Sequence, residues 1–148
     1  MSMANKPVVA IGSDHAGREI RKICFQRLND QGYETIDLGV GDEIVSADYP
    51  KIAFELSKLI TSGAAKFGVL VCGTGVGMAM AANRFKGVRA VNCLSEFMAR
   101  MSRAHNDANV LTLGQRIVGP GLALSILDEF LASDFEGGRH LNRVKMLN

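Results

Sequence analysis

The sequence predicts an α/β fold with a Rossmann-like, three-layer sandwich, in which helices cover both faces of a five-stranded parallel sheet. Two observations support this prediction. Short β-branched apolar runs alternate with longer segments of helical period, which is the rhythm of repeated βαβ units. Runs such as Val69-Leu70-Val71 are apolar without interruption, as strands are when a sheet is covered on both faces.

Taken in order along the chain, the apolar runs predict five strands and the helical periods predict five helices. The strands are expected at residues 7–12, 33–38, 67–72, 88–92 and 109–113. The helices are expected at residues 18–31, 51–62, 78–85, 95–104 and 122–132. In the first helix Ile20, Cys24 and Leu28 share one face, and Pro50 suits the first turn of the second helix.

Length and composition indicate one buried core, so residues 1–148 are expected to form a single domain. Residues 1–6 are expected to be a short extension and residues 137–148 a basic C-terminal tail. The formal net charge of +2 argues against nucleic acid or a membrane surface as a partner. Neither a spanning apolar run nor a signal-like start is present, so a cytoplasmic protein is expected. Three cysteines without a Cys-x-x-Cys pair argue against disulfides and structural zinc.

Polar residues gather where the predicted strands end. In open parallel sheets, ligands bind outside the carboxyl ends of the strands. The first strand runs into residues 13–17 (Ser-Asp-His-Ala-Gly) and the third into residues 73–77 (Gly-Thr-Gly-Val-Gly), while His105 and Asn106 lie just before the fifth. We expect one crevice to collect all of them.

Cys72 and the glycine-rich segment after it are the sharpest element. Three glycines allow backbone amides to approach a ligand closely, and the N-terminus of the following helix favours negative charge. Helix N-termini also favour the thiolate form of cysteine, which makes Cys72 a candidate proton acceptor. The alternative is a buried cysteine at a strand end. The spacing G-x-G-x-G supports dinucleotide or P-loop chemistry only weakly.

The other polar residues are ambiguous when each is taken alone. Asp14 fits a helix cap as well as a ligand, and His105 fits a solvated turn. Arg139 and Arg143, four residues apart, can clamp an anion or simply form a solvated helix face. Arg116, after the fifth strand, has the same two interpretations.

Five segments in order carry a resemblance to a known family. They are residues 12–17, 48–50, 72–77, 103–109 and 137–140. Together they resemble type B ribose-5-phosphate isomerases and the related galactose-6-phosphate isomerase subunits, from Val8 to about Val144. The resemblance implies a homodimer with shared active sites. Whether two such dimers pair into a tetramer stays open. It implies a sugar-phosphate substrate and no metal or organic cofactor.

The same resemblance implies roles for individual positions. Cys72 matches the thiol base that moves a proton between two sugar carbons. The positions that match groups opening the sugar ring are Thr74, His105 and Asp14. Those that match the anion-stabilising loop are Gly73, Gly75 and Gly77. Four positions match phosphate ligands, some of them from the partner subunit: His15, Arg116, Arg139 and Arg143. Two positions match contacts to the sugar hydroxyls or the enediolate: Tyr49 and Asn106.

The expected reaction is the interconversion of ribose 5-phosphate and ribulose 5-phosphate through an enediolate. Some relatives use a glutamate just after the glycine loop, but Met78 follows Gly77 here, so the chain fits the thiol variant. One alternative is a six-carbon substrate, allose or galactose 6-phosphate, with selectivity in residues 39–48 and 92–97. Another is a binding module that holds a sugar phosphate without turnover.

Overall fold

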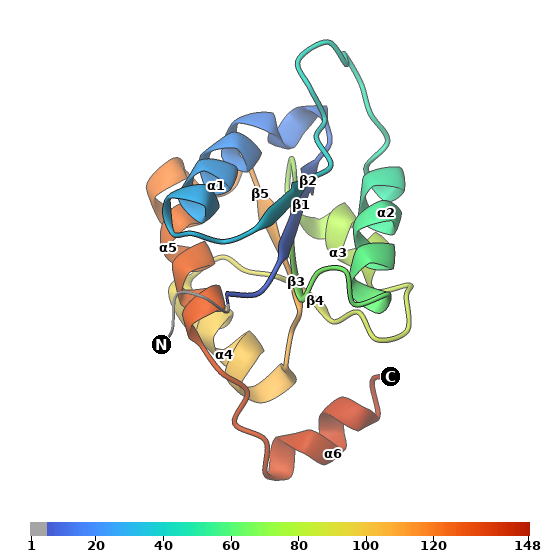
Figure 1. The fold of residues 1–148 in the computed structure, drawn as a ribbon, viewed down its shortest axis with the longest axis vertical. Helices are drawn as coiled ribbons and strands as arrows, with labels where there is room; N and C mark the ends of the chain where they lie inside the picture. The colour runs from blue at the N-terminus through green and yellow to red at the C-terminus, as the bar shows by residue number, and fades with distance from the viewer. Residues whose placement is uncertain (1–5) are drawn as a thin grey trace.

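A five-stranded sheet, all of whose pairings are parallel, organises the chain in a computed structural model that describes residues 6–148. The spatial order of the strands is β2-β1-β3-β5-β4 (Figure 1). Their bounds are β1 Val9–Ser13, β2 Thr35–Asp37, β3 Phe67–Cys72, β4 Ala90–Asn92 and β5 Val110–Gly114. The predicted α/β fold with five parallel strands is confirmed.

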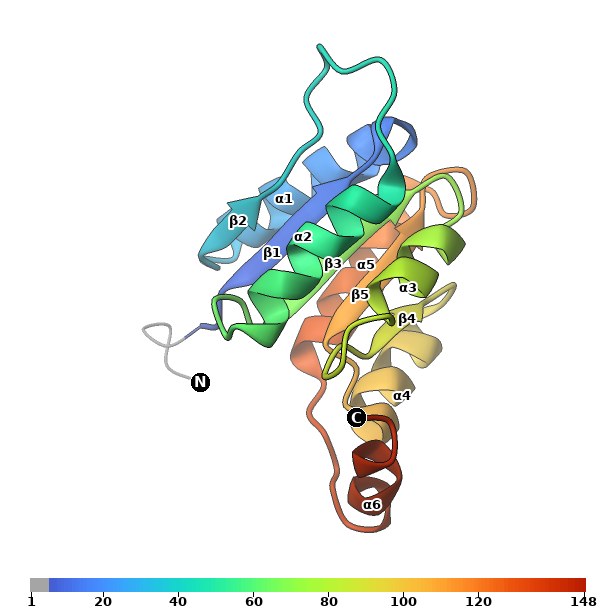
Figure 2. The same cartoon turned by 90° about the vertical axis from the view of Figure 1, so that its right-hand side faces the viewer.

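Helices cover both faces of the sheet and make three layers (Figure 2). One face carries α1 (Arg18–Asp30), α4 (Glu96–Asn106) and α5 (Pro120–Ala132), and the other carries α2 (Tyr49–Thr61) and α3 (Val76–Ala82). A short 3-10 turn, η2 (His15–Gly17), precedes α1, and α6 (Arg139–Lys145) forms the tail beyond the sheet. Among the described residues no helix combines the length and apolar character needed to cross a membrane.

Alternating side chains of the strands fill two separate cores. On β3, Val69 and Val71 point into the core under α1, α4 and α5, whereas Leu70 and Cys72 point into the core under α2 and α3. This alternation follows from the two-residue repeat of a strand. It places the thiol of Cys72 on the α2–α3 side, at the carboxyl edge of the sheet.

The ends of several elements differ from prediction. Helix α2 begins at Tyr49 rather than at residue 51, with Pro50 in its first turn as expected. Helix α3 covers Val76–Ala82 rather than residues 78–85, because residues 83–85 continue as turns. Helix α4 runs two residues past its predicted end and is closed by Asp107, whose φ of 48° ends the helix. The predicted extension at residues 1–6 lies, apart from Lys6, outside the described residues.

Candidate active site

The ends of β1, β3 and β5 lie side by side and gather polar groups at the carboxyl edge. Ser13 pairs with Val71, and Cys72 pairs with Gly114. The N–H of Arg116 donates to the carbonyl of Gly73 at 3.0 Å. The segment after β5 is therefore bound to the glycine loop after β3, which brings Arg116 to the same edge as Cys72.

The thiol of Cys72 lies at the base of the glycine loop. It is only 5% exposed, and its Sγ atom accepts a hydrogen bond from the N–H of Gly75 at 3.1 Å. Gly75 has a φ of +84°, a conformation that favours glycine, and a Cβ atom there would lie 2.2 Å from the Oδ1 atom of Asn92. A backbone donor is therefore directed at the sulfur of Cys72.

Asn92, at the end of β4, holds the glycine loop in place. Its Nδ2 atom donates to the carbonyl of Thr74 at 3.2 Å, and its Oδ1 atom accepts from the hydroxyl of Thr112 at 3.2 Å. The hydroxyl of Thr74 accepts from the N–H of Val76 at 3.2 Å. Sequence reasoning assigned Asn92 only to a region of selectivity, because nothing local in the sequence connects it with residue 74.

Asp14 and His15 lie beside this loop, after β1. The carboxylate of Asp14 is buried and accepts from the N–H of Ala16 at 2.9 Å, so Asp14 caps the short turn η2, as one of its two interpretations expects. The Nδ1 atom of His15 accepts from the N–H of Ala47 at 3.1 Å, which ties the long loop before α2 to this edge.

A pocket of about 610 Å³ opens at this edge. Asp14, His15, Tyr49 and Phe54 contribute to its lining, together with residues 46–48, 50 and 51. The ring of Tyr49 lies directly against Gly77, where a Cβ atom would approach the ring carbons to 2.8 Å. The predicted residues Asp14, His15, Tyr49, Cys72–Gly77 and Arg116 are thus all at the carboxyl edge.

His105 and Asn106 lie at the opposite, amino edge of the sheet. They end α4, and the chain then enters β5, whose Val110 pairs with Gly68 at the start of β3. From Gly68 to Cys72 a strand rises about 13 Å. A single chain therefore does not bring all these residues into one crevice. A helix between parallel strands returns the chain to the amino edge, and His105 stands at that end of its helix.

A second cluster forms where α6 crosses the end of α4 (Figure 1). His105, Asn106, His140 and Arg143 line a pocket of about 320 Å³, with Val144 and Leu147. Arg139 begins α6 and is exposed. Both predicted arginines of the tail and both residues of the end of α4 are thus at the amino edge.

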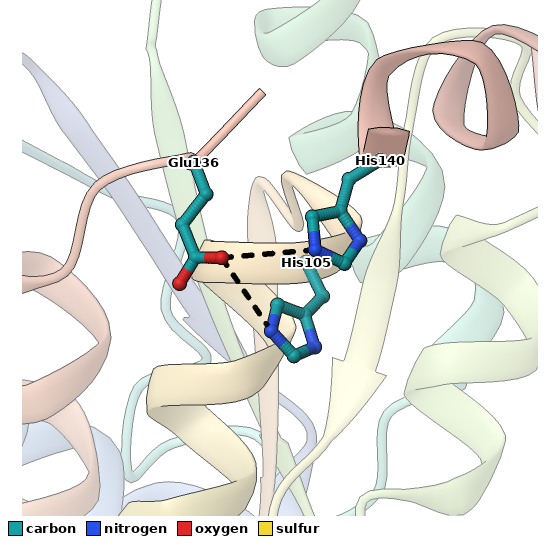
Figure 3. Close-up of side chains that lie close together, drawn as sticks. All are labelled: His105, Glu136 and His140. Carbon is teal, nitrogen blue, oxygen red and sulfur yellow. Dashed lines mark ion pairs between the residues drawn. The ribbon is translucent and has the colours of Figure 1, made fainter. Parts of the chain in front are cut away.

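Two stacked imidazole rings and one carboxylate make the centre of this second cluster. The rings of His105 and His140 stack with their centres 4.2 Å apart and their planes at 11°. The Oε1 atom of Glu136 lies 3.7 Å from the Nε2 atom of His105 and 3.6 Å from that of His140 (Figure 3). Burial, and then the nearby His105 and Arg139, lower the pKa of His140 from its usual value of 6.5.

Sequence reasoning did not name His140 or Glu136 as site residues. His140 stood in one of the family segments but received no role, and its contact with His105 depends on how the tail folds back. Glu136 lies four residues before His140, outside any helix, so no helical spacing connected the two side chains.

The other two cysteines are buried elsewhere. Cys24 and Cys93 belong to the core under α1, α4 and α5. Burial raises the pKa of Cys24 to about 12 and that of Cys93 to about 11. Their thiols are therefore held protonated at neutral pH, in the core on the opposite face of the sheet from Cys72.

Comparison with known proteins identifies the family. The family model described as Ribose/Galactose Isomerase matches residues 9–147. The chain is 42% identical over 139 residues to ribose-5-phosphate isomerase B of Escherichia coli, which covers 94% of this chain and 93% of that protein. It is 43% identical over 140 residues to a probable ribose-5-phosphate isomerase B of Mycoplasma pneumoniae, with 95% and 91% covered.

Solved structures agree with this result. A ribose 5-phosphate isomerase from Thermotoga maritima is 44% identical, with a TM-score of 0.93 over 97% of this chain and 98% of that one. A ribose-5-phosphate isomerase B from Mycoplasma genitalium, solved with bound ribulose-5-phosphate, is 40% identical with a TM-score of 0.90, covering 95% and 93%. The chain belongs to the ribose/galactose isomerase family of sugar-phosphate aldose–ketose isomerases.

Proposed function

We propose that this chain interconverts ribose 5-phosphate and ribulose 5-phosphate through an enediolate, with Cys72 as the base. The observation that carries the proposal is the hydrogen bond from the N–H of Gly75 to the Sγ atom of Cys72 at 3.1 Å. It directs a backbone donor at the sulfur, beside a glycine-rich loop that lets backbone amides come close to a ligand. The names of the E. coli, T. maritima and M. genitalium relatives support the five-carbon substrate.

The reaction needs ring opening before isomerisation. A proton is delivered to the ring oxygen and another leaves the anomeric hydroxyl, a task for the imidazole of His105 with Asp14 or Thr74. In the open aldose, the thiolate of Cys72 takes the proton from C2, and the electron pair moves to the aldehyde oxygen to give the enediolate. A proton then moves from the C2 hydroxyl to the C1 oxygen, and return of the proton from the thiol to C1 gives the ketose with its carbonyl at C2.

The glycine loop has a second task in this scheme. Negative charge develops on the enediolate oxygens, and backbone amides of the loop at Gly73 and Gly77 stabilise it, by about 3 kcal/mol for each well-placed donor, while the amide of Gly75 is directed at the Cys72 sulfur. Tyr49 and Asn106 hold the hydroxyls. Binding of the distant phosphate by His15, Arg116, Arg139 and Arg143 keeps the open chain aligned with the thiol.

Because Cys72 and His105 lie at opposite edges of one chain, the scheme requires a second copy. We infer a homodimer in which the amino-edge cluster of one chain completes the carboxyl-edge pocket of the other. A group of exposed apolar side chains in and beside α3 and the start of α4 supports such a contact: Val76, Met80, Leu94, Phe97 and Met98. The proposed setting for this reaction is the cytoplasm.

A six-carbon sugar phosphate is the second candidate substrate, because the family model covers galactose as well as ribose isomerases. His15 fixes the loop before α2 at Ala47, so this loop forms one wall of the pocket and limits the length of the sugar. One more carbon changes binding by only about 1–3 kcal/mol in a tolerant pocket.

The direct test is the initial rate of the purified protein, in EDTA, with ribose 5-phosphate, allose 6-phosphate and galactose 6-phosphate. The proposal expects the highest kcat/KM with ribose 5-phosphate. A higher kcat/KM with a six-carbon substrate would show that the second candidate is right. Binding without turnover of any of the three would indicate a module that only holds sugar phosphates.

A further inference from the structure

We propose that His105, Glu136 and His140 form a binding site for a divalent transition-metal ion of the zinc type. The inhibitory consequence of this site rests on the proposed function, because His105 is assigned there to ring opening. The binding itself depends only on the geometry of the amino-edge cluster.

The donor atoms are already close to the spacing that an ion requires. One ring nitrogen of each histidine and one carboxylate oxygen lie within 4.8 Å of one another, and Glu136 Oε1 is 3.7 and 3.6 Å from the Nε2 atoms of His105 and His140 (Figure 3). Ligand atoms bound to tetrahedral zinc at its usual bond lengths are about 3.4 Å apart. The donors thus need to move only a few tenths of an ångström closer to the carboxylate.

Backbone contacts hold the three donors together. The N–H of Glu136 donates to the carbonyl of Ala104 at 3.0 Å, which fixes the segment before α6 next to His105. The N–H of His140 donates to the carbonyl of Gly137 at 3.0 Å and begins the first turn of the tail helix. The cluster is therefore built from two segments that the fold binds to each other, rather than from side chains that meet by chance on a surface.

The donor set determines which ions fit. Two imidazoles and one carboxylate are the ligands of many three-ligand zinc sites, in which water takes the fourth position. Imidazole nitrogen favours zinc, nickel, cobalt and copper over magnesium and calcium, which prefer oxygen. The side chains of His105 and Glu136 are 37% and 57% exposed, so an ion can enter, whereas that of His140 is 9% exposed and is anchored.

Metal binding requires one local change. The stacked rings are nearly parallel, and the lone pair of a ring nitrogen lies in the ring plane, so both lone pairs cannot point at one ion until a ring turns. Rotation about χ2 of histidine is a broad, low-cost motion, and the more exposed ring of His105 has room for it. Binding should therefore break the stack between His105 and His140.

Occupation of the site has a chemical consequence. A metal ion on the Nε2 atom of His105 uses the electron pair with which that atom accepts a proton. His105 then cannot act as acid or base in ring opening, so the bound ion inhibits turnover of the cyclic sugar. A chelator should restore the activity, because no covalent bond is broken or formed.

The test is a titration of the EDTA-treated, desalted protein with Co²⁺, followed by its visible absorption, and with Zn²⁺, followed by calorimetry. We expect one ion per chain in the wild type. Glu136→Gln and His140→Asn should each weaken binding at least about tenfold, since the loss of a direct ligand costs no less than the loss of its supporting contacts. The matched controls are Asp134→Asn, an exposed carboxylate two residues upstream, and His15→Asn, an imidazole at the other edge, both of which should keep the wild-type affinity.

Two outcomes would overturn the site: no ion bound by the wild type, or wild-type affinity in both Glu136→Gln and His140→Asn. The metal titrations are independent of turnover, so they test the site even if the proposed reaction is wrong. The inhibitory consequence is tested separately. It is supported if Zn²⁺ inhibits ribose 5-phosphate turnover in the wild type, if the inhibition is weaker in Glu136→Gln, and if EDTA reverses it. Full activity with the ion bound would refute the inhibition but not the metal site.

Discussion

The Sγ atom of Cys72 accepts a hydrogen bond from the N–H of Gly75, three residues along the chain, at 3.1 Å. This contact exists because Gly75 adopts a φ of +84°, which turns its amide back toward the end of β3. A cysteine at the end of a strand thereby has a backbone donor directed at its sulfur, beside the glycine loop.

Replacement of Cys72 tests the proposed role of its thiol as the base. Cys72→Ala should reduce kcat by about 10²–10⁴-fold, the usual contribution of a general base, with little change in KM. Cys72→Ser keeps a similar shape but is a much weaker base at neutral pH, so it should be nearly as impaired. Circular dichroism of both variants serves as the control for folding. Normal turnover by a folded Cys72→Ala protein would rule out the thiol mechanism.

The close contact between Gly17 and β3 predicts that an added methyl group destabilises the fold at residue 17 but not at an open glycine position. A Cβ atom at residue 17 would lie 2.4 Å from the carbonyl oxygen of Val71, and backbone cannot yield easily. Gly17→Ala should therefore lower the free energy of unfolding by about 1–3 kcal/mol. Gly121→Ala, in the first turn of α5, meets no atom within 4 Å and should be neutral or stabilise by up to about 1 kcal/mol. Urea unfolding of both variants makes the comparison.

The guanidinium of Arg21 joins the end of β1 to the start of the long loop. Its nitrogens donate to the Oγ atom of Ser13 at 3.1 Å, to the carboxylate of Asp37 at 2.7 Å and to the carbonyl of Val40 at 3.1 Å. Arg21→Met removes the partner of the buried Ser13 hydroxyl and of the more exposed oxygens of Asp37 and Val40, and should cost about 2 kcal/mol of stability.

The neighbouring residue provides the matched control for this prediction. Lys22 makes an exposed ion pair with Asp42 at 2.9 Å, and Lys22→Met should cost less than about 1 kcal/mol. Equal losses in Arg21→Met and Lys22→Met, measured by urea unfolding, would contradict the structural role of the buried arginine.

The buried thiol of Cys24 predicts a fall of stability in alkali. Its pKa is raised to about 12 in the folded protein, against about 8.5 in the unfolded chain. The stabilisation from keeping this thiol protonated is complete below the unfolded pKa and is lost as pH rises toward the folded one. Between pH 9 and 11, the free energy of unfolding should fall more steeply in the wild type than in Cys24→Ala, by about 1.4 kcal/mol per pH unit. Parallel slopes for the two proteins would contradict the prediction.

The strands and core helices were predictable from sequence because their signals are local. The uninterrupted apolar run at residues 67–72 and the one-sided pattern of Ile20, Cys24 and Leu28 reflect burial that each element carries in its own residues. The ends of helices were less predictable, since Asp107 ends α4 through a backbone conformation that no pattern of apolar residues reveals.

The site was predictable only where its residues follow strands. Asp14 and Cys72 were placed correctly because the ends of β1 and β3 are adjacent. Contacts between distant segments were not predictable. The Oε1 atom of Gln115 accepts from the N–H groups of Glu19 and Ile20 and so caps α1, and Glu136 lies between two histidines. Each of these contacts depends on the completed fold.

The most direct test of the account concerns the separation of Cys72 and His105. In a dimer with shared sites, a Cys72→Ala chain paired with a His105→Asn chain has one site with both changes and one site with neither. Mixing the two inactive variants, with exchange of differently tagged subunits verified, should therefore restore about a quarter of wild-type activity, since about half of the dimers are mixed and each has one intact site. Activity that stays at the sum of the two variants alone, with mixed dimers present, would show that Cys72 and His105 do not act together across two chains.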